Sequence, residues 1–288
     1  MKDSMFKNLI ELTKVRIGFL VLTHTTIIGF YLGSQGKIDK MLLLFTVIGT
    51  LLSSTGSSVM NNVIESESDK LMDRTKNRVL PTKKISLNFA KFLGISFIIL
   101  GLLILYFKVN FLTCMLSLLT IILYLFLYTP LKRKSWLNTS VGAIPGAIPP
   151  LGGWTAATNS LEWGGIAVFL ILFFWQHPHF YSIAYMYKED YRNAGLQMLP
   201  AIDNGIKRTV LHIFLHALIL IPISTLPFFL GVSGRVYFVG AYILSNIYML
   251  FCLPFILEQN KDNAQLIFKT SIYYFPLLLF LIVADLRV

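Results

Sequence analysis

Long apolar stretches alternate with short polar segments along the whole chain. A helix needs about 20 mostly apolar residues to cross a bilayer, and nine windows of this kind can be drawn within the 288 residues. Because lipid cannot satisfy backbone N–H and C=O groups, such windows are expected to form helices. The pattern predicts an all-α, polytopic membrane protein, a bundle of about nine transmembrane helices in a single domain over residues 1–288. The predicted spans are 15–32, 41–60, 89–107, 111–128, 137–156, 163–187, 210–230, 236–257 and 267–284.

The composition agrees with a membrane protein. Hydrophobic residues make up 55% of the chain and charged residues 14%, whereas soluble domains carry about 25% charged residues. The net charge of +11 is compatible with binding to nucleic acid, but the basic residues occupy short segments between apolar windows. We therefore expect the lipid bilayer, and no nucleic acid, as the partner. Cys114 and Cys252 lie within apolar windows and are expected to stay reduced.

The distribution of Lys and Arg predicts an orientation in the membrane. If the N-terminus is cytoplasmic, 20 of the 25 Lys and Arg residues fall in cytoplasmic segments, as the positive-inside rule requires. We expect a multi-pass protein of the cell (inner) membrane with its C-terminus outside. The apolar window nearest the N-terminus has no small-residue cleavage signal, so it is expected to be a retained span. The longest polar segments, 61–87 and 188–207, both fall on the cytoplasmic side, where we expect the active site.

The first polar cluster follows the predicted span 41–60. If the helix continues, Asn61, Glu65 and Asp69 recur every four residues and share one face. Magnesium takes one or two carboxylates and shares its other positions with water and substrate phosphates. Arg74 and Arg78 follow directly and can bind phosphate oxygens. The spacing favours a magnesium–diphosphate site over the alternative, a solvated and charge-balanced loop.

A second polar cluster interrupts the predicted span 163–187. Residues 175–181 read Trp-Gln-His-Pro-His-Phe-Tyr. Ionisable groups at membrane depth are costly and usually indicate a functional site, and Pro178 interrupts the helical hydrogen bonding. The span ends in a polar segment that contains Lys188 and Asp190. Chemistry is therefore expected at both clusters.

These clusters carry a family resemblance. One signature, Asn-x-x-x-Asp-x-x-x-Asp followed by Arg-Thr-x-x-Arg, is matched by Asn61, Glu65, Asp69, Arg74, Thr75 and Arg78. Another, Pro-His-Phe leading to Lys-x-Asp-Tyr-x-x-Ala-Gly-x-x-Met-Leu-Pro, is matched by Pro178, His179, Phe180, Lys188, Asp190, Tyr191, Ala194, Gly195, Met198, Leu199 and Pro200. On these residues the chain resembles the haem O synthases, or protohaem IX farnesyltransferases, within the UbiA superfamily of intramembrane prenyltransferases.

The likeness covers roughly residues 12–205 and includes a central region around 128–154. The sequence departs from the family pattern at four positions. Glu65 and Glu67 replace the usual Asp residues, Ser66 replaces a common Arg, and Val79 stands where Pro is usual. Glu keeps the charge of Asp and adds one methylene, so these departures affect the metal geometry and not the class of reaction.

The resemblance implies transfer of a farnesyl group from farnesyl diphosphate to a vinyl group of protohaem IX, with addition of water, to give haem O. It also implies Mg²⁺ as cofactor, and suggests a haem A synthase or oxidase assembly proteins as partners. Metal binding is assigned to Asn61, Glu65, Asp69 and Asp190, which with Lys188 form the catalytic set. Diphosphate binding is assigned to Arg74, Arg78, Lys132, Arg133 and Lys188.

The paired histidines of the second cluster are the candidates for contact with haem. Imidazole is a common iron ligand, which favours His177 and His179, with Trp175 as a third candidate. The alternative for each histidine is a buried ring whose partner is a backbone carbonyl. Trp175 has the alternative of an ordinary core aromatic residue.

Other polar residues near the spans have weaker assignments. His24 is a further candidate for haem contact, whereas His212 and His216, one turn apart without a carboxylate, are expected to pack between helices. Lys14 and Arg16 resemble a Lys-Pro-Arg element of the family in which a valine replaces the proline. An interfacial anchor is an equally good interpretation of these two residues.

Three rival functions remain open at this stage. A UbiA-type aromatic prenyltransferase of quinone biosynthesis would use the same diphosphate site but has no need of paired histidines. A membrane transporter would place its ionisable groups near the bilayer midplane, whereas the carboxylates here collect at one membrane face. A structural subunit of an oxidase assembly is the third alternative.

Overall fold

The computed structural model describes residues 2–14 and 24–287, which form an α-helical bundle. Within this part of the chain the only β pairing is an isolated bridge between Ser233 and Leu286. The long helices are α4 (Lys40–Asp69), α5 (Leu87–Lys108), α6 (Phe111–Ile122), α8 (Asn138–Thr158), α9 (Trp163–Met186), α12 (Lys207–Phe229), α13 (Arg235–Leu257) and α14 (Lys261–Ala284). The shorter ones are α1 (Lys2–Thr13), α3 (His24–Gly33), α7 (Thr129–Leu131), α10 (Lys188–Asn193), α11 (Leu199–Ile202) and the π-helix η2 (Leu123–Tyr128).

Seven helices of the described chain are long and apolar enough to cross a membrane. Six of them are α4, α5, α9, α12, α13 and α14, and the seventh is the continuous run of α6, η2 and α7 over Phe111–Leu131. The predicted window 137–156 forms α8, a 21-residue helix that includes three prolines. The predicted window 15–32 includes α3, while its residues 15–23 lie outside the described part. The prediction of an all-α polytopic membrane protein with about nine spans is confirmed.

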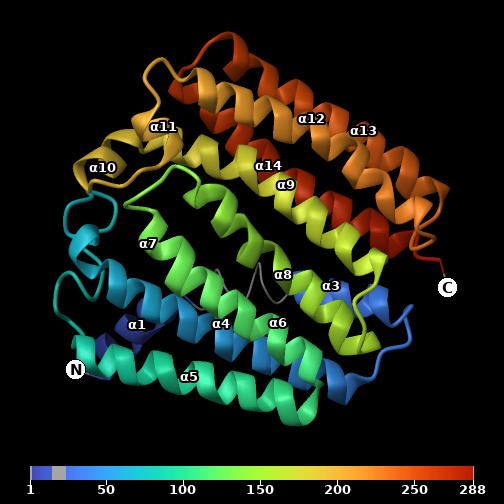
Figure 1. Cartoon of the computed structure of the whole chain (residues 1–288), viewed down its shortest axis with the longest axis horizontal. Coiled ribbons are helices and arrows are strands. Elements are labelled where there is room, and N and C mark those ends of the chain that lie inside the picture. Colours follow the sequence, from blue (N-terminus) through green and yellow to red (C-terminus); the bar gives the residue numbers. More distant parts are fainter. Residues whose placement is uncertain (1, 15–23, 288) are drawn as a thin grey trace.

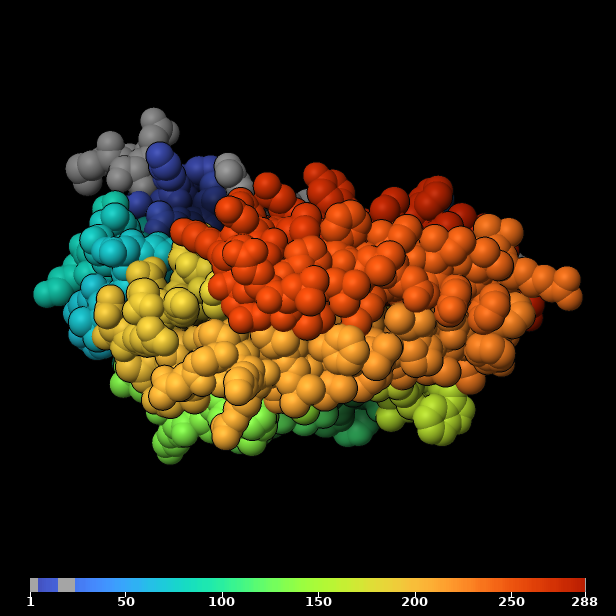
Figure 2. Space-filling view, turned by 90° about the horizontal axis from the view of Figure 1, so that it is seen from above, coloured from blue at the N-terminus to red at the C-terminus, as the bar shows by residue number. Residues whose placement is uncertain are grey.

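The two long polar segments lie at the same end of the bundle. Figure 1 shows α10 and α11 beside the connection between α4 and α5, with the C-terminus at the opposite end. In Figure 2 the surface of α12 and α13 occupies much of the visible face, and the α10–α11 segment again lies at the end that holds the α4–α5 connection. The fold therefore brings together the two segments that carry the sequence signatures.

Glycines allow α4 and α5 to pack closely. A Cβ atom on Gly56 would lie 2.6 Å from the carbonyl oxygen of Gly94, and one on Gly101 would lie 2.5 Å from the backbone nitrogen of Ser53. Small residues at helix–helix contacts permit this approach in membranes, where van der Waals packing replaces the hydrophobic effect between helices. The tight packing fixes α4, whose C-terminal half carries the first polar cluster.

The core of the bundle divides into unequal parts. A large cluster of buried side chains joins α9, α12, α13 and α14, and includes Trp175, Tyr237 and Tyr274. A smaller cluster joins α1 and α4 to the start of α5, and another lies under α10 and α11. A cavity lies between α4, α6, α8 and α9, so the large core supports one of its walls and the α4–α5 pair supports another.

The close packing of α4 on α5 generates a stability prediction. Gly101→Val should destabilise the folded protein by about 1–3 kcal/mol, because the added side chain has to displace the backbone of α4. The measurement is the midpoint of thermal unfolding in detergent micelles, followed by helical circular dichroism. Gly152→Ala is the matched control, since Gly152 is also helical and a Cβ there meets nothing within 4 Å. Equal midpoints for the two variants would contradict the packing argument.

Candidate active site

A cavity of about 610 Å³ lies between the two halves of the bundle. Residues from Thr50 to Asp69 of α4 form one wall, and at 1.5 Å per residue this wall is about 28 Å long. Near Asp69 the lining is charged, and farther along it consists of apolar side chains and Ser or Thr hydroxyls. The cavity can therefore hold a long molecule with a charged end and an apolar body.

The three oxygen donors of α4 all line this cavity. The helix continues to Asp69, as the sequence analysis assumed, so Asn61, Glu65 and Asp69 lie along one wall. Nδ2 of Asn61 donates to Oγ1 of Thr129 at 2.9 Å, and that hydroxyl donates to the carbonyl oxygen of Tyr124 at 2.8 Å. Because the amide nitrogen of Asn61 is used in this way, its oxygen is left as an acceptor for a ligand.

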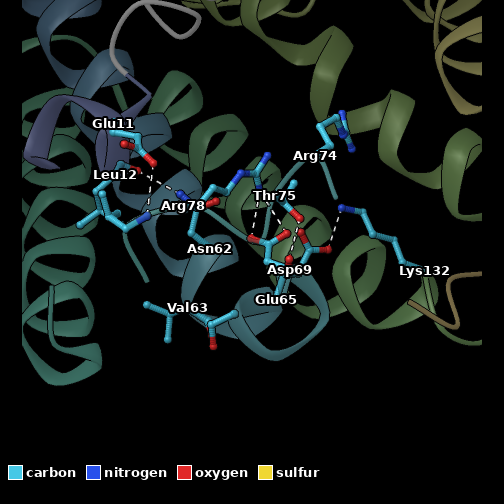
Figure 3. A network of polar contacts seen from close by, with 12 residues as sticks. Glu11, Leu12, Asn62, Val63, Glu65, Asp69, Arg74, Thr75, Arg78 and Lys132 are labelled. Atoms are coloured by element: carbon cyan, nitrogen blue, oxygen red, sulfur yellow. Dashed lines mark hydrogen bonds and ion pairs between the residues drawn. The ribbon is translucent and has the colours of Figure 1, made fainter. Parts of the chain in front are cut away.

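Each carboxylate of the stripe is paired with one cation. Nζ of Lys132 lies 2.7 Å from Oε1 of Glu65, and both side chains are 15% exposed. Nη1 of Arg78 lies 2.9 Å and 3.1 Å from the two oxygens of Asp69, which is almost fully buried. Figure 3 shows Glu65 and Asp69 side by side, with Arg78 and Lys132 approaching from opposite sides. Such pairing is what a partly buried charge requires.

The N-terminal helix α1 is tied to the same region. The carbonyl oxygen of Leu12 accepts a hydrogen bond from Asn62 at 3.0 Å, and Oε1 of Glu11 accepts one from the backbone of Val79 at 3.2 Å. Lys14 follows this helix with a φ of 48° and lines the cavity. These contacts connect the start of the chain to the loop that carries Arg78 (Figure 3).

Lys14 is a further candidate site residue, for which the sequence allows two interpretations. Burial and, next to it, the positive charges of Arg78 and Lys132 lower the pKa of its ammonium group to about 8. Among the described residues its Nζ has no ion-pair or hydrogen-bond partner. An accessible cation beside two paired cations is suited to an anionic ligand. The other member of that element, Arg16, lies outside the described residues.

Arg74 links the two sequence signatures. Its guanidinium lies over the rings of Tyr187 and Tyr191 at 5.1 Å and 5.6 Å, and Nη2 donates to the hydroxyl of Tyr191 at 3.1 Å. Its backbone nitrogen donates to Oδ2 of Asp190 at 3.3 Å. Arg74 itself lines the cavity. The polar segment after α9 therefore closes against the loop after α4.

Three of the residues predicted to bind metal or diphosphate lie outside the cavity lining. Lys188 and Asp190 line a separate hollow of about 230 Å³ that also includes Lys261, and Nζ of Lys188 lies 4.6 Å from the centre of the Tyr185 ring. Arg133 donates to Oγ of Ser68 at 2.5 Å. These side chains surround the charged end of the cavity without facing into it.

His179 and Trp175 both face the cavity. Their rings stack with centres 5.0 Å apart, and both lie among the lining residues. Nδ1 of His179 is 2.7 Å from Oγ of Ser271, and the indole nitrogen of Trp175 donates to the carbonyl oxygen of Ser271 at 3.0 Å. The two stacked rings form an aromatic part of the cavity wall, anchored on α14 through Ser271.

His177 points away from the cavity. Its Nδ1 is 2.8 Å from the carbonyl oxygen of Phe173, its Nε2 is 3.1 Å from Oγ of Ser140, and its ring stacks on His216 at 3.8 Å. Residues two apart on a helix lie on nearly opposite faces, so only one of the paired histidines can face a common ligand. His177 thus has the environment of the alternative interpretation, a buried ring with a backbone carbonyl partner. His24, the further candidate, is exposed on α3.

The donors on the wall of α4 are suited to a magnesium ion. An amide oxygen and two carboxylates are hard oxygen ligands, and Mg²⁺ commonly takes only one or two carboxylates and completes its shell with water and phosphate. No cluster of three His, Cys, Asp or Glu side chains forms a self-sufficient metal site in residues 2–14 and 24–287. Asn61, Glu65 and Asp69 therefore fit a metal that arrives together with a phosphate ligand.

Comparison with known proteins agrees with this geometry. The sequence profile of the UbiA prenyltransferase family matches residues 22–279. A protohaem IX farnesyltransferase of Solibacter usitatus is 41% identical over 97% of this chain and 98% of its own length. The solved structure of a digeranylgeranylglyceryl phosphate synthase superposes with a TM-score of 0.83 at 19% identity, over 97% of this chain and 98% of that one.

A second solved structure has the same fold. It is a UbiA homologue of Archaeoglobus fulgidus bound to GPP and Mg²⁺, with a TM-score of 0.70 and 16% identity, over 96% of this chain and 99% of that one. At these identities the two structures show the fold alone, whereas the profile match and the Solibacter relative show the family. The chain is thus an enzyme and not a transporter or a structural subunit: it belongs to the UbiA prenyltransferase family, among the protohaem IX farnesyltransferases.

Proposed function

We propose that this protein transfers a farnesyl group from farnesyl diphosphate to a vinyl group of protohaem IX and produces haem O. The observation that carries the proposal is the single cavity that joins a carboxylate–cation cluster to a long apolar chamber with an aromatic wall. The relatives named protohaem IX farnesyltransferase support the choice of substrates. We propose residues 1–288 as one functional unit.

The charged end of the cavity is the proposed diphosphate site. Asn61, Glu65 and Asp69 would hold Mg²⁺, and Lys132 and Arg78 are close enough to move from these carboxylates to phosphate oxygens. When bound, the metal would stabilise the negative charge that develops on the diphosphate as the allylic C–O bond breaks. Arg74 and Lys14 line the same end and would bind the remaining phosphate oxygens.

The apolar part of the cavity is the proposed place of carbon–carbon bond formation. The C1–O bond of farnesyl diphosphate breaks with its electron pair on the diphosphate, and the outer vinyl carbon of protohaem bonds to C1. Leu172, Ile148 and Ile183 line this region and exclude bulk water, which would otherwise quench the allylic cation. His179 and Trp175 offer aromatic contacts for the porphyrin in the cavity wall.

Asp190 and Lys188 keep their proposed roles in metal and phosphate binding only if the segment after α9 moves. Arg133, which lies between α7 and α8, keeps its proposed role only if its side chain leaves Ser68. In the structure Asp190 accepts from the backbone of Arg74, and Lys188 lies in the neighbouring hollow. A bound diphosphate would attract these groups toward the cavity. Until such a movement, Asp190 is a positioning residue for the loop that carries Arg74.

The surroundings of the enzyme are part of the proposal. The protein is a multi-pass membrane protein. We propose that it lies in the cell (inner) membrane with the N-terminus and the charged end of the cavity on the cytoplasmic side, as the positive-inside rule predicts. A haem A synthase or an oxidase assembly protein is the proposed partner for its product.

The substrate assignment predicts a specific product. Membranes of cells that lack their own enzyme and express this chain should convert protohaem IX and farnesyl diphosphate to haem O. The measurement is extraction of the haems, chromatography and mass spectrometry. Prenylation of an added aromatic acid, with no change in the haem, would instead establish the quinone-type alternative.

The oxygen donors of α4 yield a prediction about charge. Glu65→Gln and Asp69→Asn should each lower kcat by about 10²–10³-fold, because the variants keep the shape and lose the charge that holds the metal. Glu65→Asp should be milder, since it keeps the carboxylate. The measurement is haem O formation at limiting Mg²⁺, with protein level checked in the membrane.

Glu67→Gln is the matched control for these variants. Glu67 lies on the same helix but is 71% exposed and pairs with Lys70 on the surface, so its loss should leave activity within twofold or so of the wild type. Full activity of Glu65→Gln at limiting Mg²⁺ would show that this carboxylate is not a ligand.

Lys14 generates a prediction about pH. Its pKa of about 8 means that the ammonium is charged at pH 7 and neutral above pH 9, whereas Arg78 stays charged. Affinity for a non-reactive thiolo analogue of farnesyl diphosphate should therefore fall as pH rises through about 8. Lys14→Met should bind more weakly at pH 7 and show a flatter profile between pH 7 and pH 9. The same pH dependence in Lys14→Met and in wild type would rule out Lys14 as the titrating group.

A further inference from the structure

The amide of Gln176 is held in one orientation inside the membrane-spanning part of α9. Its Nε2 donates to the carbonyl oxygen of Leu172 at 2.9 Å and to that of Ala143 at 3.3 Å. Both amide hydrogens are used, and the reverse orientation would direct Oε1 at two carbonyl oxygens. The side chain is 4% exposed. Oε1 is therefore fixed as a hydrogen-bond acceptor.

This oxygen has no hydrogen-bond donor among the described residues and faces the cavity. Gln176 and Gly146 both line the cavity, and a Cβ atom on Gly146 would lie only 2.2 Å from Oε1. Six side-chain atoms of the described chain are fully enclosed and have no hydrogen-bond partner, and Oε1 is not one of them. Although it has no partner there, Oε1 is thus not sealed off by protein atoms. The missing side chain of Gly146 thus leaves Oε1 reachable from inside the cavity.

An accessible acceptor at this depth requires a donor. An unpaired polar atom in an apolar surrounding destabilises the structure, and a water molecule is the smallest group that can satisfy it. The neighbouring lining residue His179 lies one turn along the same face of α9. A water on Oε1 would therefore lie beside the aromatic wall where the porphyrin is proposed to bind.

We propose that Gln176 holds the water molecule that becomes the hydroxyl group of the product. This inference rests on the proposed function. Once the outer vinyl carbon has bonded to C1 of the farnesyl group, the positive charge lies on the inner vinyl carbon beside the porphyrin ring. That carbon can bond to a water oxygen, giving the hydroxyl, or lose a proton, giving an alkene. In the first case the water proton passes to the released diphosphate, and the reaction is balanced.

The cavity has to exclude bulk water and still supply one water molecule to the reaction. Bulk water must be excluded to protect the allylic cation, yet one water is a reactant in the next step. An acceptor that binds a single water through one hydrogen orients the oxygen lone pair toward the second cation. Gln176 should therefore affect the ratio of the alkene to the hydroxyl product and not the rate at which the diphosphate leaves.

The test is the ratio of alkene to hydroxyl product in extracted haems, since the alkene is lighter by one water. Gln176→Leu should raise this ratio roughly tenfold, as expected for loss of one hydrogen bond in the transition state. Gly146→Ala is the second variant, because its methyl group would displace Oε1 while the glutamine itself is kept. It should shift the ratio in the same direction.

Asn246→Leu is the matched control. Asn246 also donates its amide to the carbonyl oxygen one turn earlier on a spanning helix, that of Tyr242 at 2.8 Å, but it does not line the cavity. Its ratio should equal that of the wild type. If Gln176→Leu and Gly146→Ala lower the total farnesylated haem but keep the wild-type ratio, Gln176 is structural and the inference is wrong. If the wild type forms no farnesylated haem, the proposed function fails instead.

Discussion

The pairing of two carboxylates with two cations at the membrane edge is the interaction on which the site depends. Asp69 is almost fully buried and Glu65 largely so, and an uncompensated charge in either place would be costly. Arg78 and Lys132 supply the compensation from the loop after α4 and from the end of α7. Because the cations come from separate segments, the ion pairs also hold those segments against α4.

The remaining structure keeps the charged end separate from the apolar interior. Close glycine packing fixes α4 against α5, and the large core of α9, α12, α13 and α14 fixes the opposite wall. The lining of the cavity between these walls consists of ion pairs at one end and of apolar and hydroxyl side chains farther along, within the length of one helix. The break of the C–O bond needs the charged end, and the cation that follows needs the apolar end. The fold places both in one cavity.

The sequence predicted the stripe on α4 because residues four apart on a helix share a face, and it predicted the helical spans because their apolar windows are long. It did not predict the partner of Asn61. Thr129 reaches that amide through the π-turn of η2, in which its backbone nitrogen bonds to Tyr124, five residues earlier. In a π-helix the backbone hydrogen bonds join residues five apart and not four apart. An apolar stretch of sequence gives no sign of this change.

The two histidines show a different limit of the sequence. Their spacing of two residues already implied opposite faces, but only the packing of His216 against His177 identifies the buried one. Lys14 and Asp190 show a third limit. Whether these side chains enter the cavity depends on how the segments after α1 and α9 fold back onto the bundle, and helix periodicity does not describe such loops.

The balance of charge explains why metal and diphosphate are expected to bind together. Glu65 and Asp69 lie with four cations at the same end of the cavity, Lys14, Arg74, Arg78 and Lys132, so the cluster is net positive. A divalent cation alone would add charge of the same sign and would have to displace Lys132 and Arg78 from their carboxylates. A magnesium ion bound to a prenyl diphosphate is net negative, and it offers the displaced cations new partners among its phosphate oxygens. On the proposed function, substrate binding would exchange these ion pairs: the metal would replace Lys132 and Arg78 at the carboxylates, and phosphate oxygens would replace the carboxylates as partners of the two cations.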